Sequence, residues 1–477
     1  MGNKTKNKEN KDLMKKAKLL PDDEGVIYAP WERTFTRLLS PFEEFIHRQT
    51  ASGLLLMGAA VLALVLANSD FAEAYQHVVH TMAGFQIGTF GLEMSLHHWV
   101  NDALMALFFF VVGMELKREM LVGELADIRK SALPIVAALG GMVVPALIFF
   151  AFNPEGDASR GWGIPMATDI AFAVGALALL ADRVPKALVT FLVALAIVDD
   201  LGAVLVIALF YTNELSLSWL GIAGLLVATL VLFNFAGIRR VIPYFCVAVL
   251  LWYAMLQSGV HATLAGVLGA FCVPARPKYD PGLFSRYVRE LMSRFDASYR
   301  AGANIMTNEK LEIVVQALDD GVKGVQTPLQ SLERDWHLPV AFLVIPIFAL
   351  FNAGIPLELA SMGEALTHPI TLGVMVGLLV GKFVGITAAC WLTIKLGIAE
   401  LPTGARFTQV AGVAVLGGIG FTMSIFIAEL GFSNHPDFLV LAKTGILGAS
   451  LLAGLIGLTW LWLVAEPQHA QATPVPD

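Results

Sequence analysis

The sequence has few charged residues, and this scarcity sets the class of protein. Asp, Glu, Lys and Arg make up 15% of its 477 residues, whereas 56% are hydrophobic. Soluble domains carry about 25% charged residues. The composition therefore excludes one or two large soluble cores and indicates many segments that are buried in lipid.

Cysteine is also scarce, and the beginning of the chain lacks the features of a signal peptide. The three cysteines, Cys246, Cys272 and Cys390, lie inside apolar runs, where free thiols are expected instead of disulfides or metal ligands. The first 40 or so residues are polar and Lys-rich, with no apolar stretch followed by a cleavage site. We expect no resident metal, no cofactor and no nucleic-acid partner; membrane lipids are the expected surroundings.

Twelve apolar runs are long enough to cross a bilayer, which takes about 17–25 residues. They predict an all-α polytopic membrane protein. The seventh and eighth are the weakest, because only residues 256–259 separate them. The approximate centres of the twelve runs are Leu62, Phe108, Val143, Val174, Asp199, Val227, Val249, Leu268, Ile347, Lys382, Gly420 and Leu452.

The basic residues set the orientation, since Lys and Arg collect in cytoplasmic loops. With the N-terminus inside, alternate loops carry residues such as Lys117, Arg183 and Arg239, and Arg160 is the exception on the outside. Lys443, near the outer end of the last span, is expected to extend outward to water. The pattern predicts a multi-pass protein of the bacterial inner membrane with both termini in the cytoplasm.

The predicted spans divide the chain into five parts. The loop at 274–337 is long enough to have structure of its own, and its apolar residues predict two amphipathic helices that lie on the membrane surface. These residues are Phe284, Val288, Leu291 and Phe295, then Leu311, Val314, Val315, Leu318 and Val322. The parts are a Lys-rich cytoplasmic tail with a juxtamembrane helix (1–50), spans one to eight (51–273), the cytoplasmic loop (274–337), spans nine to twelve (338–464) and a cytoplasmic tail (465–477).

A short outer segment, residues 85–93, has strand-like pieces around glycines. It predicts a β-hairpin. An exposed hairpin edge can pair with a second copy, so we expect a homodimer through this segment.

Four charged residues lie near the centres of spans, where each is unfavourable by roughly 2.5–3.5 kcal/mol. They are Asp169 in the fourth span, Asp199 and Asp200 in the fifth and Lys382 in the tenth. Charges kept at this cost usually mark an ion or proton path. A purely structural ion pair cannot account for all four, because one ammonium group leaves two of the three carboxylates unmatched.

Helix geometry separates the roles of the adjacent aspartates, whose side chains point about 100° apart. We pair Lys382 with Asp199 and assign Asp200 as the principal carrier of cation and proton. Burial and a neighbouring carboxylate both favour the protonated form of a carboxyl group. Oxygen ligands without a His or Cys cluster suit a hard cation such as sodium or lithium, with sodium at Asp200 and Asp199.

Two spans contain helix breakers. The fourth contains Gly163–Asp169 with a proline, and the eleventh contains Gly417–Ser424 with three glycines. Spans three to five and ten to twelve start on opposite sides of the membrane, so they can form an inverted repeat whose middle helices are both discontinuous. At the crossing of these helices, Asp169 would offset the positive helix ends and Lys382 the negative ones.

Several stretches resemble the NhaA family of bacterial sodium/proton antiporters, for which inverted repeats with discontinuous helices are a known property. They extend from the second span to the eleventh. The matching stretches are residues 101–109, 167–173, 194–203, 259–266, 381–382 and 417–426.

The resemblance implies two crossing discontinuous helices, the fourth and eleventh. It also implies a sodium site at Asp200 and Asp199 beside Thr168, with Lys382 on Asp199. It further implies electrogenic exchange of sodium for a larger number of protons, activation at alkaline pH, and roles in pH and sodium homeostasis. The positions that match the family's pH-sensing cluster are Glu115, Glu119, Glu333 and His337, and Arg334 stands where some members have a second histidine. The family core lacks the insertion near 278–326.

Other functions remain open at this point. An intramembrane aspartyl protease would require a different second aspartate motif, so we expect no enzyme. A channel would conduct without Asp200, and a proton-coupled carrier of similar fold would take up an organic substrate. His261 favours a packing role over a proton relay, and Asp102 fits helix packing and a secondary path equally well.

Overall fold

The computed structural model describes residues 49–87, 90–181, 183–212, 215–298, 308–356 and 362–465. The chain divides into two compact units, Met1–Ala51 and Ser52–Asp477, and nearly all of the described residues belong to the second. Nearly all of the predicted N-terminal tail, and the predicted C-terminal tail after Ala465, fall outside the described residues.

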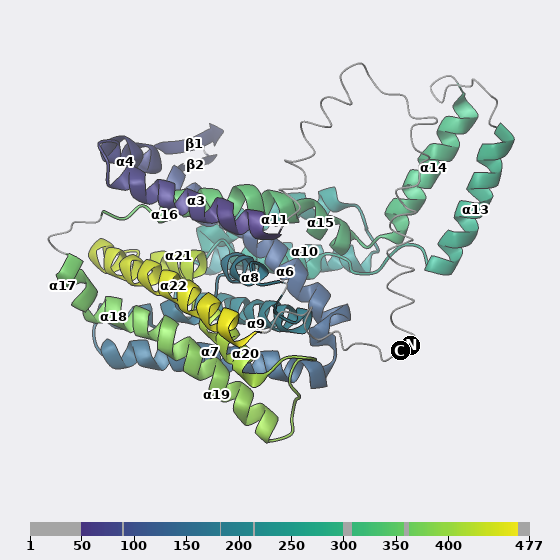
Figure 1. Ribbon diagram of the computed structural model, residues 1–477. Helices are drawn as coiled ribbons and strands as arrows, with labels where there is room; N and C mark the ends of the chain where they lie inside the picture. The colour runs from purple at the N-terminus through teal and green to yellow at the C-terminus, as the bar shows by residue number, and fades with distance from the viewer. Residues whose placement is uncertain are drawn as a thin grey trace, which may run out of the picture. The chain divides into compact units, whose positions relative to one another are not determined.

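The described part of the chain is mainly helical (Figure 1). Short 3-10 helices form at Glu124–Ala126 and Asp157–Met166, and π-helical segments form at Trp99–Leu104, Val340–Val344 and Gly377–Gly381. The α-helices are α3 (Gln49–Ala67), α4 (Ala72–His80), α5 (Leu96–His98), α6 (Met105–Val122), α7 (Ile128–Phe152), α8 (Ile170–Ala178), α9 (Lys186–Phe210), α10 (Leu217–Phe235), α11 (Val241–Ser258), α12 (Leu264–Cys272), α13 (Pro281–Ser298), α14 (Glu309–Val325), α15 (Pro328–Pro339), α16 (Ile345–Asn352), α17 (Met362–Thr367), α18 (Pro369–Val376), α19 (Lys382–Lys395), α20 (Phe407–Leu416), α21 (Phe421–Gly431) and α22 (Pro436–Val464).

Among the described residues, nine helices are long and apolar enough to cross a membrane, or up to eleven if each of two bent pairs counts as one span. The bent pairs are α3 with α4 and α20 with α21. Ten of the twelve predicted centres lie in these helices, and Gly420 lies at the break between α20 and α21. The remaining centre, Leu268, lies in α12, which has nine residues. Gly259 separates α11 from α12 with a φ of 82°, which a residue without Cβ adopts readily.

The burial pattern is that of a protein surrounded by lipid. Large apolar side chains lie on the outside, such as Leu217 and Phe235 at the two ends of α10, which are 80% and 86% exposed. The interior instead contains fully buried polar side chains, including Thr168, Asp199 and Lys382. Apolar surface facing outward and charges facing inward fit a multi-pass membrane protein.

The predicted hairpin is present and longer than expected. Strands β1 (Met82–Ile87) and β2 (Phe90–Ser95) pair antiparallel, with Gly84 opposite Glu93. Trp99, at the start of the following π-helical segment, donates a hydrogen bond from Nε1 to the carbonyl of Ala83 at 2.8 Å. This contact ties the hairpin to the span that begins at Leu96.

Two helices of the long loop, α13 and α14, pack side by side (Figure 1). The predicted loop 274–337 also includes most of α15, which belongs to the apolar segment Pro328–Asn352. Leu291, Leu311 and Val314 from the predicted apolar faces are buried, whereas Val315 and Val322 are 39% and 45% exposed. The two helices therefore bury part of their apolar faces, and the predicted stripe on α14 is only partly covered.

Helices α7 and α19 approach closely because glycines face one another. A Cβ at Gly385 would lie 2.8 Å from the carbonyl carbon of Gly140, and a Cβ at Gly381 would lie 2.8 Å from Cα of Pro145. Such backbone contact is typical of helices that pack in lipid. It brings the N-terminal end of α19, where Lys382 lies, against the middle of α7.

Two helix interruptions meet in the core. The first is an extended stretch, residues 167–169, between the 3-10 helix and α8. The second lies between α20 and α21, whose axes are bent by 47°. The backbone nitrogen of Asp169 donates to the carbonyl of Ile419 at 2.7 Å. Each interruption thus supplies a hydrogen-bond partner for the other, as buried irregular backbone requires.

Candidate functional site

Asp199 and Asp200 lie in the middle of α9, and Lys382 is the first residue of α19; all three side chains are fully buried. The stem of Lys382 passes α7 at Gly141, where an added Cβ would lie 3.6 Å from its Cδ. Lys382 Nζ contacts Asp199 Oδ2 in a buried ion pair. The structure therefore brings together the fifth-span carboxylates and the tenth-span lysine at one depth.

Thr168 connects Asp199 to the second interruption. Its hydroxyl lies 2.8 Å from Asp199 Oδ2 and 2.8 Å from the carbonyl oxygen of Gly417. Because a hydroxyl has one proton, it donates to only one of these acceptors at a time. Asp199 Oδ2 thus receives both Lys382 and Thr168, and this oxygen is the well-satisfied one of the site.

The carboxylate of Asp200 differs from that of Asp199 in its hydrogen-bond partners. Among the described residues, neither of its carboxylate oxygens has a hydrogen-bond partner, and the same holds for Oδ1 of Asp199. A buried carboxylate without a partner is unfavourable by several kcal/mol, so such a group binds a proton or a cation. Three carboxylate oxygens are therefore available at this place for either ion.

Asp169 lies where two helices begin. Its Oδ1 accepts a hydrogen bond from the backbone nitrogen of Phe172 at 2.9 Å, which caps α8. Its Oδ2 accepts from the backbone nitrogen of Thr422 at 3.1 Å and from the Thr422 hydroxyl, at the start of α21. A carboxylate at the positive ends of two helices is favourable, which fits the predicted charge balance.

The donors in this core suit a hard cation. Carboxylates, the Thr168 hydroxyl and the Gly417 carbonyl offer oxygen atoms, the ligand type that sodium and lithium prefer. In the described ranges no group of three or more His, Cys, Asp and Glu side chains could hold a metal ion.

The residues predicted for pH sensing gather between α6 and α15. His337 Nδ1 lies 3.3 Å from Glu115 Oε1. Arg118 connects the other two, since its guanidinium lies 3.0 Å from Glu119 Oε1 and 3.1 Å from Glu333 Oε1. Sequence reasoning gave Arg118 no part in this cluster, although its spacing from Glu115 places both on one face of α6.

The two residues with open roles have distinct surroundings. His261 Nε2 lies 2.6 Å from the carbonyl oxygen of Tyr211, a contact that suits a packing role. The backbone carbonyl of Asp102 accepts a hydrogen bond from Trp252 Nε1 at 3.2 Å, which leaves the role of its carboxyl group open.

Sequence reasoning missed a second buried charge pair. Glu429 lies in α21, and Lys443 of α22 places its Nζ 2.5 Å from Glu429 Oε1. The expectation that Lys443 extends outward is wrong, because the residue is only 9% exposed and its ammonium group turns to this carboxylate. A count of every charge within the spans would have drawn attention to Glu429.

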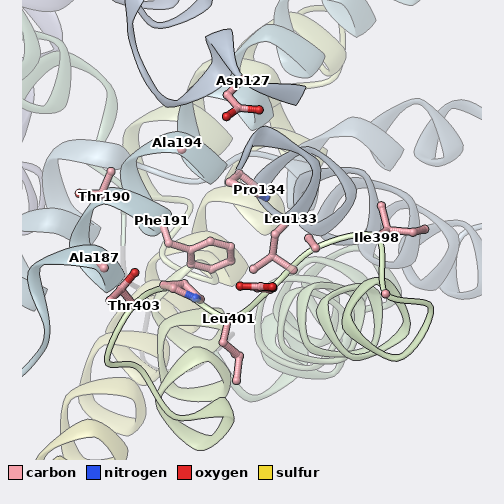
Figure 2. Close-up of a pocket in the computed structure, with 14 residues that line it drawn as sticks. Asp127, Leu133, Pro134, Ala187, Thr190, Phe191, Ala194, Ile398, Leu401 and Thr403 are labelled. Carbon is pink, nitrogen blue, oxygen red and sulfur yellow. The ribbon is translucent and has the colours of Figure 1, made fainter. Parts of the chain in front are cut away.

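One pocket lies at the loops predicted to be cytoplasmic, with a volume of about 760 Å³. Figure 2 shows its wall coming from three parts of the chain: Leu133 and Pro134 of α7, Thr190 and Phe191 of α9, and the connection around Leu401. Its lining also includes Ala194, which precedes Asp199 by five residues, or about 7.5 Å along a helix.

Apolar helices around buried carboxylates and a buried lysine define a polytopic membrane ion transporter. Residues 43–461 match the model of the Na+/H+ antiporter 1 family. The chain is 55% identical over 444 residues to the Na+/H+ antiporter NhaA 1 of Saccharophagus degradans, covering 93% of this chain and 96% of that one. It is 51% identical over 440 residues to the Na+/H+ antiporter NhaA of Sulfurimonas denitrificans, covering 92% and 99%.

The chain belongs to the Na+/H+ antiporter 1 family. The resemblance predicted from its motifs is thereby confirmed, and so is the prediction that it is a transporter and not an enzyme.

Proposed function

We propose that this chain is an electrogenic antiporter that extrudes sodium or lithium in exchange for a larger number of protons. The names of its relatives support the two ions, since they are Na+/H+ antiporters. The observation that carries the proposal is Asp200, whose two oxygens are fully buried without a hydrogen-bond partner among the described residues. Such a group alternates between a proton and a cation because it is unfavourable without either.

A sodium ion that binds Asp200 and the available Oδ1 of Asp199 would add a positive charge beside the buried ion pair of Asp199 and Lys382. The ratio above one proton per sodium is part of the proposal because the resemblance to the family implies it.

The same proposal includes the finer architecture. Twelve transmembrane helices form two inverted repeats, and the two interrupted spans cross at the site. The mutual hydrogen bond between Asp169 and Ile419, and the position of Asp169 at two helix starts, support this arrangement. Basic loop residues support a place in the bacterial inner membrane with both termini in the cytoplasm.

The proposal also includes activation of exchange by alkaline pH and assembly into a homodimer. Alkaline pH would activate exchange through Glu115, Glu119, Glu333 and His337, because the contact of His337 on α15 with Glu115 on α6 weakens when His337 loses its proton. The β1–β2 hairpin, which includes most of residues 85–93, offers edges through which two copies could pair into a homodimer. Exchange of this kind would serve pH and sodium homeostasis.

Asp200→Asn tests the central step. Sodium added to everted membrane vesicles should drive proton movement with the parent protein and none with this variant, because an amide can neither ionise nor balance a cation. Asp319→Asn is the matched control, since Asp319 is exposed on α14 and, within the described part of the chain, pairs with Lys323 of the same helix. Both variants are compared at equal protein level in the membrane.

Three results would contradict the proposal. Normal sodium-driven proton movement in Asp200→Asn would remove Asp200 from the mechanism. Sodium conduction that survives in this variant would indicate a channel. Proton-coupled uptake of an organic acid by the parent protein would favour the alternative carrier.

A further inference from the structure

A second polar cluster lies at the end of the helices next to the β1–β2 hairpin. We name His97, Asn101, Asn352, Glu429 and Lys443 the hairpin-side cluster. Besides its contact with Lys443, Glu429 Oε1 lies 3.5 Å from His97 Nε2. His97 Nε2 lies 3.0 Å from Asn352 Oδ1, and Asn352 Nδ2 donates to Asn101 Oδ1 at 2.8 Å. Lys443 of α22 and His97 of α5 thus contact the carboxylate of Glu429. The two asparagines join this network through His97.

The hairpin-side cluster and the aspartate site lie at different depths along the same helices. Glu429 follows Thr422 by seven residues on α21, so both are on one face of the helix and about 10 Å apart along its axis. Thr422 is the residue that contacts Asp169. In the span Leu96–Val122, His97 precedes Glu115 by 18 residues, or roughly 27 Å. The hairpin-side cluster and the predicted pH-sensing residues therefore lie at opposite ends, with the aspartate pair between them.

An apolar layer separates the two polar regions. The ring of Phe426 lies 5.5 Å from that of Phe109 and 6.2 Å from that of Phe348, and all three residues are at most 1% exposed. Phe426 stands between Thr422 and Glu429 on α21. Glu429, Lys443 and His97 have side chains that are 10%, 11% and 19% exposed. The hairpin-side cluster thus lies on the other side of this layer from the aspartate site, and it is nearer to solvent than that site.

The hairpin-side cluster has the chemistry of a cation site. It repeats the lysine–carboxylate pair of Lys382 and Asp199, and the two asparagines are connected to it through His97. A carboxylate suits a hard monovalent cation. A lysine ammonium can occupy that carboxylate when no cation does, which avoids an unpaired buried charge.

We propose that Glu429 is a second cation-binding carboxylate, on the route between Asp200 and the hairpin-side surface, and that Lys443 competes with the transported cation for it. The inference rests on the proposed function, because it assigns Glu429 to the same sodium ions. It gives the two members of one ion pair opposite effects on sodium binding.

The test compares the apparent KM for sodium at each membrane face. Sodium is added to right-side-out vesicles, which present the face predicted for the hairpin, and to everted vesicles. Glu429→Gln should raise KM about tenfold in right-side-out vesicles only, as expected for loss of one charged ligand. Lys443→Met should lower KM at that face, because the carboxylate no longer has a competing ammonium group.

The double variant Glu429→Gln/Lys443→Met keeps the test decisive if a single variant folds poorly, since it removes both charges together. It should retain the raised KM at the hairpin face. The exposed pair of α14 supplies the control, Asp319→Asn/Lys323→Met, which should leave both KM values unchanged.

A structural ion pair would give other results. Both single variants would then lower the protein level or the maximal rate without moving KM, or move it equally at both faces, and the double variant would restore the parental KM. Any of these overturns the inference while the proposed function stands. Absence of sodium-driven proton movement in the parent protein would instead overturn both.

Discussion

The two lysine–carboxylate pairs of this protein are alike in chemistry and differ in surroundings. Lys382 and Asp199 are fully buried, and beside them Asp200 has two oxygens without a partner among the described residues. Lys443 and Glu429 remain about one-tenth exposed, with a histidine and two asparagines around them. The first pair leaves an adjacent carboxylate for an ion, whereas in the second the paired carboxylate is itself the proposed ligand.

The difference teaches that an ion pair alone does not mark the transport site. Breaking a buried pair leaves an uncompensated charge, and the penalty grows as solvent is excluded. Burial therefore decides how strongly each lysine is held, and the neighbouring groups decide what else can bind. The two pairs can be compared in stability, in sodium affinity and in pH dependence.

The largest effect is expected on stability. Lys382→Met leaves the carboxylate of Asp199 without its partner, and loss of one member of a fully buried pair destabilises by roughly 3–5 kcal/mol. Lys443→Met leaves Glu429 within reach of solvent, so we expect a loss of about 1–2 kcal/mol. Thermal unfolding of the purified proteins in detergent measures both.

The double variants Asp199→Asn/Lys382→Met and Glu429→Gln/Lys443→Met serve as controls for that comparison. Each removes a whole pair and should recover part of the stability that the single lysine variant loses, because no unpaired charge remains. Equal losses for Lys382→Met and Lys443→Met would show that the difference in burial has no energetic consequence.

A smaller effect is expected on sodium affinity from the hydroxyl of Thr168. Thr168→Val removes the hydrogen bond to Asp199 Oδ2 and should raise the apparent KM for sodium about tenfold or less, since one such bond to a charged group contributes roughly 1.5 kcal/mol. The measurement is sodium-driven proton movement in everted vesicles across a range of sodium concentrations.

Thr393→Val is the matched control for this change. Thr393 is buried in α19, and its hydroxyl donates to the carbonyl of Ala389 within the same helix at 2.7 Å. It should leave the KM unchanged. Equal KM values for both valine variants would indicate that Thr168 acts only in folding.

The smallest effect is expected on pH dependence. Protonated His337 pairs with Glu115 and holds α6 against α15, so this contact is present at low pH and is lost as pH rises. If the contact restrains exchange, His337→Asn should start exchange at lower pH. The shift should be under about one pH unit, because a partly exposed pair contributes roughly 0–1 kcal/mol and about 1.36 kcal/mol corresponds to one unit.

His435→Asn is the matched control for the pH profile, since His435 Nε2 also lies 3.3 Å from a carboxylate, that of Asp157, outside the predicted sensor. Its profile should coincide with that of the parent protein. A shift to higher pH for His337→Asn would mean that the contact favours exchange instead of restraining it.

Much of the architecture could be predicted because lipid imposes strict local rules. Apolar runs of fixed length, basic loops and charges at span centres are visible one segment at a time. The glycine and proline clusters located both interruptions to within a few residues. The prediction of the eighth span was weak because only residues 256–259 separate its apolar run from the seventh. The helix found there, α12, is nine residues long.

Contacts between distant segments were harder to predict. The pair of Glu429 and Lys443 joins α21 to α22, and Arg118 connects α6 to α15. Nothing local distinguishes Lys443 from a lysine that extends to water, because its partner is decided by how the last two helices pack. The error about Lys443 follows directly from that.

The sequence by itself determined a polytopic helical protein with three carboxylates and a lysine near the centres of its spans, because each such charge is unfavourable in lipid wherever its helix packs. It also determined that Asp199 and Asp200 point in different directions, since helix geometry is local. The sequence suggested that Lys382 pairs with Asp199, but only the tertiary structure shows that α19 meets α9 at Asp199 and leaves Asp200 without a partner among the described residues. The physical reason is that pairing depends on helix-to-helix distance and rotation, which glycine contacts such as Gly385 with Gly140 set.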